Sequence, residues 1–274
     1  MRHLLSRAGG VLQILAIALL AAVCVDAAVS ADSNEQQVDT ALVVSVDISN
    51  SVDEHRYELQ MDGIAAALED EGVINAITNG PNGAILLSMV AWSDTPSLVL
   101  PWTRIASKDE AKAVAAKIRK LPHQTGEFTC MTRMLRSVND KVVTQIPAQA
   151  TRVVVDVSGD GPDNCNADEP IEGVRDELVS NGVTVNGLPV NIGDPSKPID
   201  TGGGAAEPSA AGAINQTLEE WYKTHVMGGT GAFVLPANGY EDFGRAMRQK
   251  FVIEISGGFP SGKKLAQGRM RDRR

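Results

Sequence analysis

Runs of aliphatic and β-branched residues alternate with amphipathic segments along most of the 274-residue chain, and this alternation constrains the fold more than any other feature. The most continuous apolar runs are residues 41–46, 84–91, 152–158 and 183–190. Such runs are typical of strands that are buried on both faces of a parallel sheet. Between the first two, Tyr57, Met61, Ile64 and Leu68 recur at helical spacing. The alternation predicts an α/β fold: a three-layer, doubly wound, mainly parallel sheet.

The remaining elements follow from the same patterns. Residues 97–103 are predicted to form an edge strand, because Pro101 has no backbone N–H to donate to a neighbour. A last strand is expected at 232–235. Further helices are expected at residues 108–120, 131–143, 170–181, 218–225 and 240–255. The segment 193–212 is rich in Gly, Pro, Ser and Ala and is interpreted as an insertion without assigned structure.

The N-terminus has the pattern of a secretory signal peptide. Arg2 and Arg7 precede an apolar run at 11–25, and small residues follow at 29–31, which predicts cleavage before Asp32. A membrane anchor and a lipoprotein cut before Cys24 are the alternatives. The predicted organisation is a signal peptide at 1–31, a polar lead-in at 32–39, one domain at 40–260 and a basic tail at 261–274. The protein is expected to be exported, to the periplasm or beyond, with no transmembrane segment.

The net charge and the cysteine content of the chain limit the classes of function that it can have. The formal net charge is −9, and the basic residues of the tail make the rest of the chain more acidic still, which argues against nucleic-acid binding. The tail is expected to be solvated, with contact to an anionic surface as the alternative. Removal of the signal peptide leaves Cys130 and Cys165, and two cysteines in an exported protein suggest one disulfide.

Oxygen-bearing side chains follow the predicted strands at three places. Asp47, Ser49 and Ser51 come directly after the first strand, Asp160 follows the strand at 152–158, and Thr129 precedes a helix. Because ligands bind beyond the carboxyl ends of strands in open α/β sheets, these side chains are expected to converge. Hard oxygen donors suit Mg²⁺, Mn²⁺ or Ca²⁺ rather than zinc or copper. Asp156, Ser158, Asp163 and Asn164 are interpreted as strand-end and turn residues.

This pattern resembles the metal-ion-dependent adhesion site of von Willebrand factor type A domains. Asp47, Ser49, Ser51, Thr129 and Asp160 match, in order, the Asp-x-Ser-x-Ser, the loop Thr and the later Asp of that family. Segments 155–161, 185–190, 228–234 and 240–246 resemble a bacterial, exported, von Willebrand A-like family of unknown function. Many type A domains have Gly-Gly before the Thr, whereas Glu127 and Phe128 make this loop bulkier. A bond between Cys130 and Cys165 would join the two loops of the site.

The resemblance implies an exported, adhesion-type module rather than an enzyme. Its cation would be completed by an Asp or Glu from a protein partner, and the oligomeric state is left open. The alternative is a metal-dependent hydrolase or phosphoryl-transfer enzyme of the cell envelope, although Ser49 stands where such enzymes need a second Asp. A third interpretation is that these residues are structural. Asp47 would then accept hydrogen bonds from backbone N–H groups in a strand–helix turn, and Ser51 would be the N-cap of the next helix.

Overall fold

The computed structural model describes residues 37–165, 168–199 and 216–257. The predicted signal peptide, the basic tail, most of the polar lead-in and residues 200–212 of the insertion lie outside these described residues. In the described part of the chain, no helix combines the length and the apolar character needed to span a bilayer.

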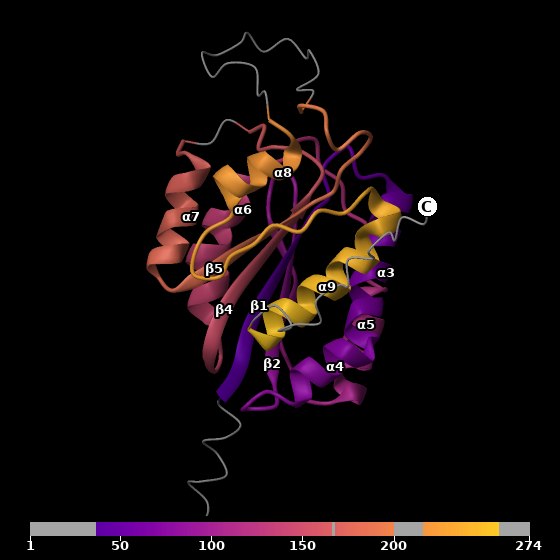
Figure 1. Cartoon of the computed structure of the whole chain (residues 1–274), viewed down its shortest axis with the longest axis vertical. Helices are drawn as coiled ribbons and strands as arrows, with labels where there is room; N and C mark the ends of the chain where they lie inside the picture. Colours follow the sequence, from indigo (N-terminus) through magenta and orange to yellow (C-terminus); the bar gives the residue numbers. More distant parts are fainter. Residues whose placement is uncertain (1–36, 166–167, 200–215, 258–274) are drawn as a thin grey trace, which may run out of the picture.

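A five-stranded sheet with the order β3-β2-β1-β4-β5 forms the centre of the domain (Figure 1). The strands are β1 (Gln37–Asp47), β2 (Ile85–Trp92), β3 (Ser97–Ile105), β4 (Gln149–Gly159) and β5 (Val183–Pro189). β3 pairs antiparallel with β2, whereas β1, β2, β4 and β5 run parallel. The predicted mainly parallel sheet is therefore confirmed, and Pro101 lies on the edge strand β3, as expected.

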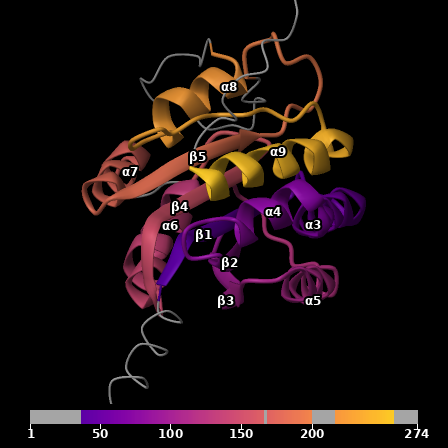
Figure 2. The ribbon, with the colours of Figure 1, turned by 60° about the horizontal axis from the view of Figure 1, so that its bottom comes forward.

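Helices cover both faces of the sheet and complete a three-layer fold (Figure 2). One layer holds α3 (Glu54–Glu69), α4 (Glu71–Thr78), α5 (Lys108–Ile118) and α9 (Phe243–Ser256). The other holds α6 (Met131–Ser137), α7 (Ile171–Ser180) and α8 (Leu218–Trp221). Short π or 3-10 turns follow α6 at Val138–Val142 and Val143–Gln145, follow α8 at Tyr222–Val226, and precede α9 at Tyr240–Asp242.

β1 shows why the sheet is buried on both sides. Leu42 and Val44 pack with the α3–α9 layer, while Val43 between them packs with the α6–α7 layer. All three are fully buried, and each such side chain stabilises the fold by roughly 1.5–3 kcal/mol. A continuous apolar run, rather than an alternating one, is what this position requires.

Two segments differ from the expectations. β1 begins at Gln37 rather than at residue 41, because Gln37 and Val38 pair with β4 and the Asp39 side chain accepts hydrogen bonds from Asn82. The strand expected at 232–235 is reduced to isolated bridges, such as Val234 with Gly187. There, the Asn186 side chain accepts a hydrogen bond from the backbone N–H of Phe233, so this segment does not form a regular hydrogen-bond ladder with β5.

Candidate metal centre

The predicted site residues lie at the carboxyl end of the central strands, the upper edge of the sheet in Figure 1. β1 and β4 are neighbours in the sheet, so the loops that follow Asp47 and Gly159 leave the sheet side by side. The loop before α6 reaches the same edge, because the backbone N–H of Asn164 donates to the carbonyl oxygen of Thr129 at 3.1 Å. Topology therefore brings three distant parts of the sequence to one place.

The side chains at this edge form a continuous chain of contacts. The Oγ atoms of Ser49 and Ser51 lie 3.2 Å apart, and Ser51 Oγ donates to Asp160 Oδ1 at 2.7 Å. Thr129 Oγ1 donates to Ser49 Oγ at 3.3 Å. Ser49 and Thr129 are buried, whereas Ser51 is exposed. The hydroxyls thus share hydrogen bonds with one another, and the group reaches solvent at Ser51.

Asp47 lies at the buried bottom of this group. Its Oδ1 accepts the Ser49 backbone N–H at 2.8 Å, and Gln60 Nε2 donates to its carbonyl oxygen at 3.1 Å. Its Oδ2 is buried and has no hydrogen-bond partner among the described residues. Burial, and secondly the neighbouring Asp160 carboxylate, raise the pKa of Asp47 to about 7. A buried carboxylate in this position would be stabilised by a cation next to it.

Tyr240 binds the second carboxylate, that of Asp160, through a hydrogen bond that the sequence did not predict. Tyr240 Oη donates to Asp160 Oδ2 at 2.9 Å. Burial, followed by the charge of Asp160, raises the pKa of Tyr240 well above its usual range, so the phenol remains a donor. The guanidinium of Arg56 lies 5.6 Å from the Tyr240 ring centroid and donates to the carbonyl oxygen of Ser51.

A second tyrosine approaches the site from the opposite helical layer. Tyr222 is fully buried, and its hydroxyl has no hydrogen-bond partner among the described residues. A Cβ on Gly159 would lie 2.9 Å from Tyr222 Oη and 3.0 Å from Asp47 Oδ2, so glycine leaves the space between them open.

Two hydrogen bonds and a disulfide link the loop that carries Thr129 to the loop after β4. Asn164 Oδ1 accepts the Thr129 N–H at 2.8 Å, and Asp163 Oδ1 accepts the Met131 N–H at 3.1 Å. The predicted disulfide between Cys130 and Cys165 is present, with a Cα–Cα distance of 5.0 Å. Phe128 is 44% exposed, which explains how the bulkier loop still places Thr129 beside Ser49.

The donor set fits a hard divalent cation. Two carboxylates and three hydroxyls are available, all through oxygen, which is the chemistry that Mg²⁺, Mn²⁺ and Ca²⁺ prefer. Among the described residues, no group of three or more His, Cys, Asp or Glu is placed to bind a metal. Hydroxyl oxygens would therefore have to complete any coordination shell here, and the unpartnered Asp47 Oδ2 is the atom most in need of a cation.

Comparisons with known proteins agree with the fold. The family described as "Protein of unknown function (DUF1194)" matches residues 37–259. No curated protein matches the chain.

Several solved structures are similar to 80% of this chain, among them the following three. Proximal thread matrix protein 1 from the mussel byssus has a TM-score of 0.57 at 13% identity, over 48% of that chain. A structure of the same protein "with zinc occupied MIDAS motif" has a TM-score of 0.52 at 17% identity, also over 48% of that chain. The von Willebrand factor type A protein from Catenulispora acidiphila has a TM-score of 0.50 at 13% identity, over 43% of that chain. The chain thus spans less than half of each structure, and the likeness shows the von Willebrand A fold alone.

Proposed function

Because this chain belongs to the DUF1194 family and has the fold of a von Willebrand A domain, we propose that it is a metal-dependent protein-binding module. The proposed metal ligands are Asp47, Ser49, Ser51, Thr129 and Asp160. The observation that carries the proposal is the continuous chain of hydroxyl and carboxylate contacts from Thr129 to Asp160, above a buried Asp47 oxygen that has no partner among the described residues.

The proposed cation is Mg²⁺, with Mn²⁺ or Ca²⁺ as possible substitutes. The zinc-occupied motif of the mussel protein supports divalent metal binding by this fold in general. Two carboxylates only balance a divalent charge, and neutral hydroxyls donate little, so the cation keeps affinity for a further anion. Asp47, Ser49 and Thr129 are buried and Ser51 is exposed, so an Asp or Glu of a protein partner would reach the cation from the side of Ser51. Ser49 supplies no second catalytic carboxylate, so a binding role is preferred to hydrolysis.

The proposed location is outside the cytoplasm, in the periplasm or beyond the cell. Two observations support it. The N-terminal residues have the signal-peptide pattern, and Cys130 and Cys165 are joined in a disulfide, which persists in oxidising compartments.

Capture of partners with and without metal tests this function. The mature protein is immobilised in Mg²⁺ and exposed to envelope and secreted proteins of its own source. The proposal predicts a partner that is released by EDTA and is not retained by Asp160→Asn. Asp62→Asn, an exposed carboxylate on α3, is the matched control and should retain the partner. Retention that is unaffected by EDTA and by Asp160→Asn would refute the proposal.

A further inference from the structure

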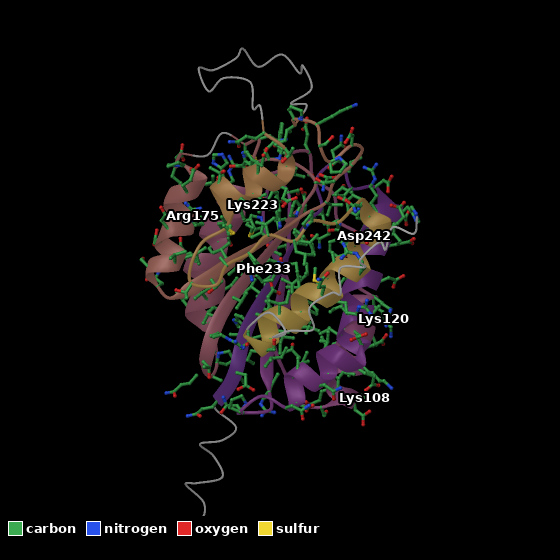
Figure 3. The ribbon with its side chains drawn as sticks, viewed as in Figure 1. Lys108, Lys120, Arg175, Lys223, Phe233 and Asp242 are labelled. Carbon is green, nitrogen blue, oxygen red and sulfur yellow. A yellow bond between two sulfur atoms is a disulfide. The ribbon has the colours of Figure 1, made fainter. Side chains whose placement is uncertain are left out.

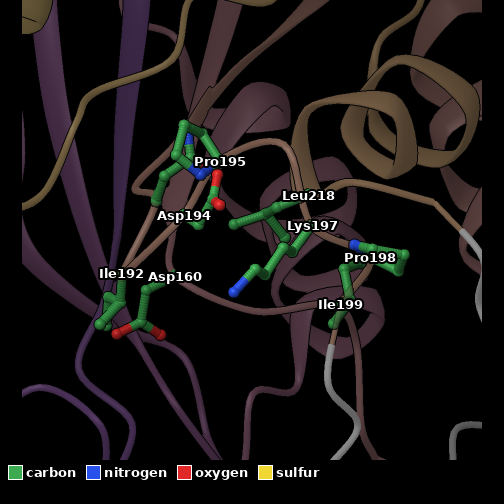
Figure 4. A pocket seen from close by; sticks show the side chains of 9 residues that line it. Asp160, Ile192, Asp194, Pro195, Lys197, Pro198, Ile199 and Leu218 are labelled. Atoms are coloured by element: carbon green, nitrogen blue, oxygen red, sulfur yellow. The ribbon is translucent and has the colours of Figure 1, made fainter.

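A cavity of about 290 Å³ opens directly beside Asp160 (Figure 4). Its apolar wall includes Ile192, Pro198, Ile199 and Leu218. Asp160, Asn191, Asp194 and Lys197 supply its polar lining, and binding pockets combine apolar walls with such placed polar groups. Because Asp160 both lines this cavity and belongs to the candidate metal centre, the cavity adjoins that centre.

Lys197 is the basic residue that lines this cavity. Figure 4 shows its side chain crossing the cavity with the ammonium directed toward Asp160. Within the described part of the chain, the ammonium has no ion pair. Asp194 is its nearest acidic neighbour in sequence, but Asp194 Oδ1 accepts from the N–H and the hydroxyl of Ser196 at 3.0 and 2.7 Å. This Asx-type turn presents Lys197 to the cavity.

The other nearby cation is committed to the protein itself. Arg56 lines an adjoining cavity together with Tyr240, but its guanidinium donates to the Ser51 carbonyl oxygen and lies against the Tyr240 ring. The chain as a whole carries a net charge of −9, which disfavours the approach of an acidic ligand. Lys197 is therefore the group placed to offset this repulsion next to the metal centre.

We propose that Lys197 binds the partner's carboxylate together with the cation, and that the apolar wall accepts an aliphatic side chain next to that acidic residue. This inference rests on the proposed function and specifies the partner: an exposed segment in which Asp or Glu adjoins Leu, Ile or Val. The Lys197 ammonium would pair with the part of the partner's carboxylate that is turned toward the cavity. The aliphatic side chain packs against Ile199 and Leu218, and Lys197 selects for the anion without holding the metal.

Two synthetic peptides, both acetylated and amidated, test the proposal: Gly-Gly-Asp-Leu-Gly-Gly and Gly-Gly-Asp-Gly-Gly-Gly. Each is titrated into the Mg²⁺-loaded mature protein and followed by amide chemical shifts, which report millimolar affinities. Mg²⁺ affinity is measured separately by calorimetry for every variant. The variants are Lys197→Ala and Lys197→Glu, with Lys120→Ala as the matched control. Lys120 is an exposed lysine at the end of α5, away from the upper edge of the sheet (Figure 3).

The expected result is a Mg²⁺ affinity within about twofold of wild type in both Lys197 variants. Lys197→Ala should weaken the Leu peptide about fivefold, as for a partly exposed ion pair, and Lys197→Glu should weaken it further. The Leu peptide should bind more tightly than the Gly peptide, and Lys120→Ala should change nothing. Unchanged peptide affinity in the Lys197 variants, or no peptide response from Mg²⁺-loaded wild type, overturns the inference alone. Wild type that binds no Mg²⁺ overturns the proposed function, and this inference with it.

Discussion

At the scale of single residues, Asp47 separates a metal-binding role from a structural one. As a structural residue, it needs only Oδ1 to accept the Ser49 N–H, and an asparagine oxygen can do the same. As a metal ligand, it needs both the negative charge and the buried Oδ2 that has no partner among the described residues. The raised pKa shows that burying this charge without a cation is unfavourable.

We therefore predict that Asp47→Asn leaves the metal-free protein as stable as wild type, or more stable, at pH 8. The variant should lose the increase in melting temperature that Mg²⁺ gives wild type. At a Mg²⁺ concentration of about 100 times Kd, that increase corresponds to about 2.7 kcal/mol. Thermal unfolding with Mg²⁺ or EDTA measures both effects. An equal Mg²⁺ stabilisation of wild type and Asp47→Asn would show that the carboxylate holds no metal.

Tyr240 is predicted to position Asp160 for the cation. Tyr240→Phe removes the hydrogen bond to Asp160 Oδ2 and should weaken Mg²⁺ binding about tenfold, as is usual when a partner of a metal ligand is lost. Tyr57→Phe is the matched control, since Tyr57 donates to the carbonyl oxygens of Leu121 and Pro122 instead. Calorimetric Mg²⁺ titration of the two variants measures the difference. Equal affinities would show that Asp160 needs no positioning by Tyr240.

At the scale of elements, the disulfide joins the start of α6 to the loop after β4 across a sequence separation of 35. By the chain-entropy estimate, closing such a loop stabilises the protein by about 3–4 kcal/mol. We predict that Cys130→Ala with Cys165→Ala lowers the urea midpoint by the corresponding amount and also weakens Mg²⁺ binding. The reason for the second effect is that Thr129 and Asp160 lie on the joined segments. Full Mg²⁺ affinity in the double variant would limit the disulfide to stability.

The sequence predicts those parts of the site that adjoin regular elements. Asp47 and Asp160 follow central strands and Thr129 precedes a helix, so the parallel topology alone brings them to one edge. The tyrosine contacts depend on packing between distant elements. Tyr222 packs closely on Gly187, where an added Cβ would lie 2.6 Å from Tyr222 Cδ1. No regular spacing in the sequence predicts this contact. The strand expected at 232–235 does not form for a similar reason. The Asn186 side chain of β5 accepts the Phe233 backbone N–H, which is then not free to pair with a strand.

At the scale of the whole molecule, a buried charge cluster joins α9 to the sheet. Lys250 Nζ lies 3.3 Å from Asp156 Oδ1 on β4 and 3.0 Å from Glu254 Oε1, and all three residues are buried. Asn186 on β5 donates to Glu254 at 2.8 Å. Lys250 and Glu254 are spaced so that they share the buried face of α9 with Met247 and Phe251. The four-residue spacing of Lys250 and Glu254 is visible in the sequence. Because apolar residues surround the pair, the sequence alone does not indicate that both charged side chains are buried.

Removing the cation of this cluster should be costly. At pH 9, above the pKa of Asp156, Lys250→Met leaves two ionised, buried carboxylates without a positive charge and is expected to lower the free energy of unfolding by about 3–5 kcal/mol. Arg248→Met on the same helix is the control: Arg248 is 53% exposed and lies 3.5 Å from Asp70, so its loss should cost less than about 1 kcal/mol. Urea unfolding measures both. Similar losses would mean that the cluster is not a specific link between α9 and the sheet.

The same cluster predicts how stability depends on pH. Burial, and secondly Glu254, raise the pKa of Asp156 to about 8, against the opposing effect of Lys250. The folded state therefore keeps a proton that the unfolded chain, with a pKa near 3.8, has released. The free energy of unfolding should fall as pH rises from about 5 to 8 and level off above that. Urea titrations in EDTA should show a smaller decline for Asp156→Asn; an equal decline would exclude Asp156 as a source.

We propose that the oxygen cluster formed with Asp47 holds a divalent cation, and calorimetric titration of Mg²⁺ and Mn²⁺ into the protein is the sharpest test of this site. Wild type, Asp47→Asn, Asp160→Asn and the control Asp62→Asn are compared at one pH. We expect one saturable site in wild type and in Asp62→Asn, and no such site in Asp47→Asn or Asp160→Asn. Binding that survives both Asp47→Asn and Asp160→Asn, or wild type that binds neither ion, would contradict it.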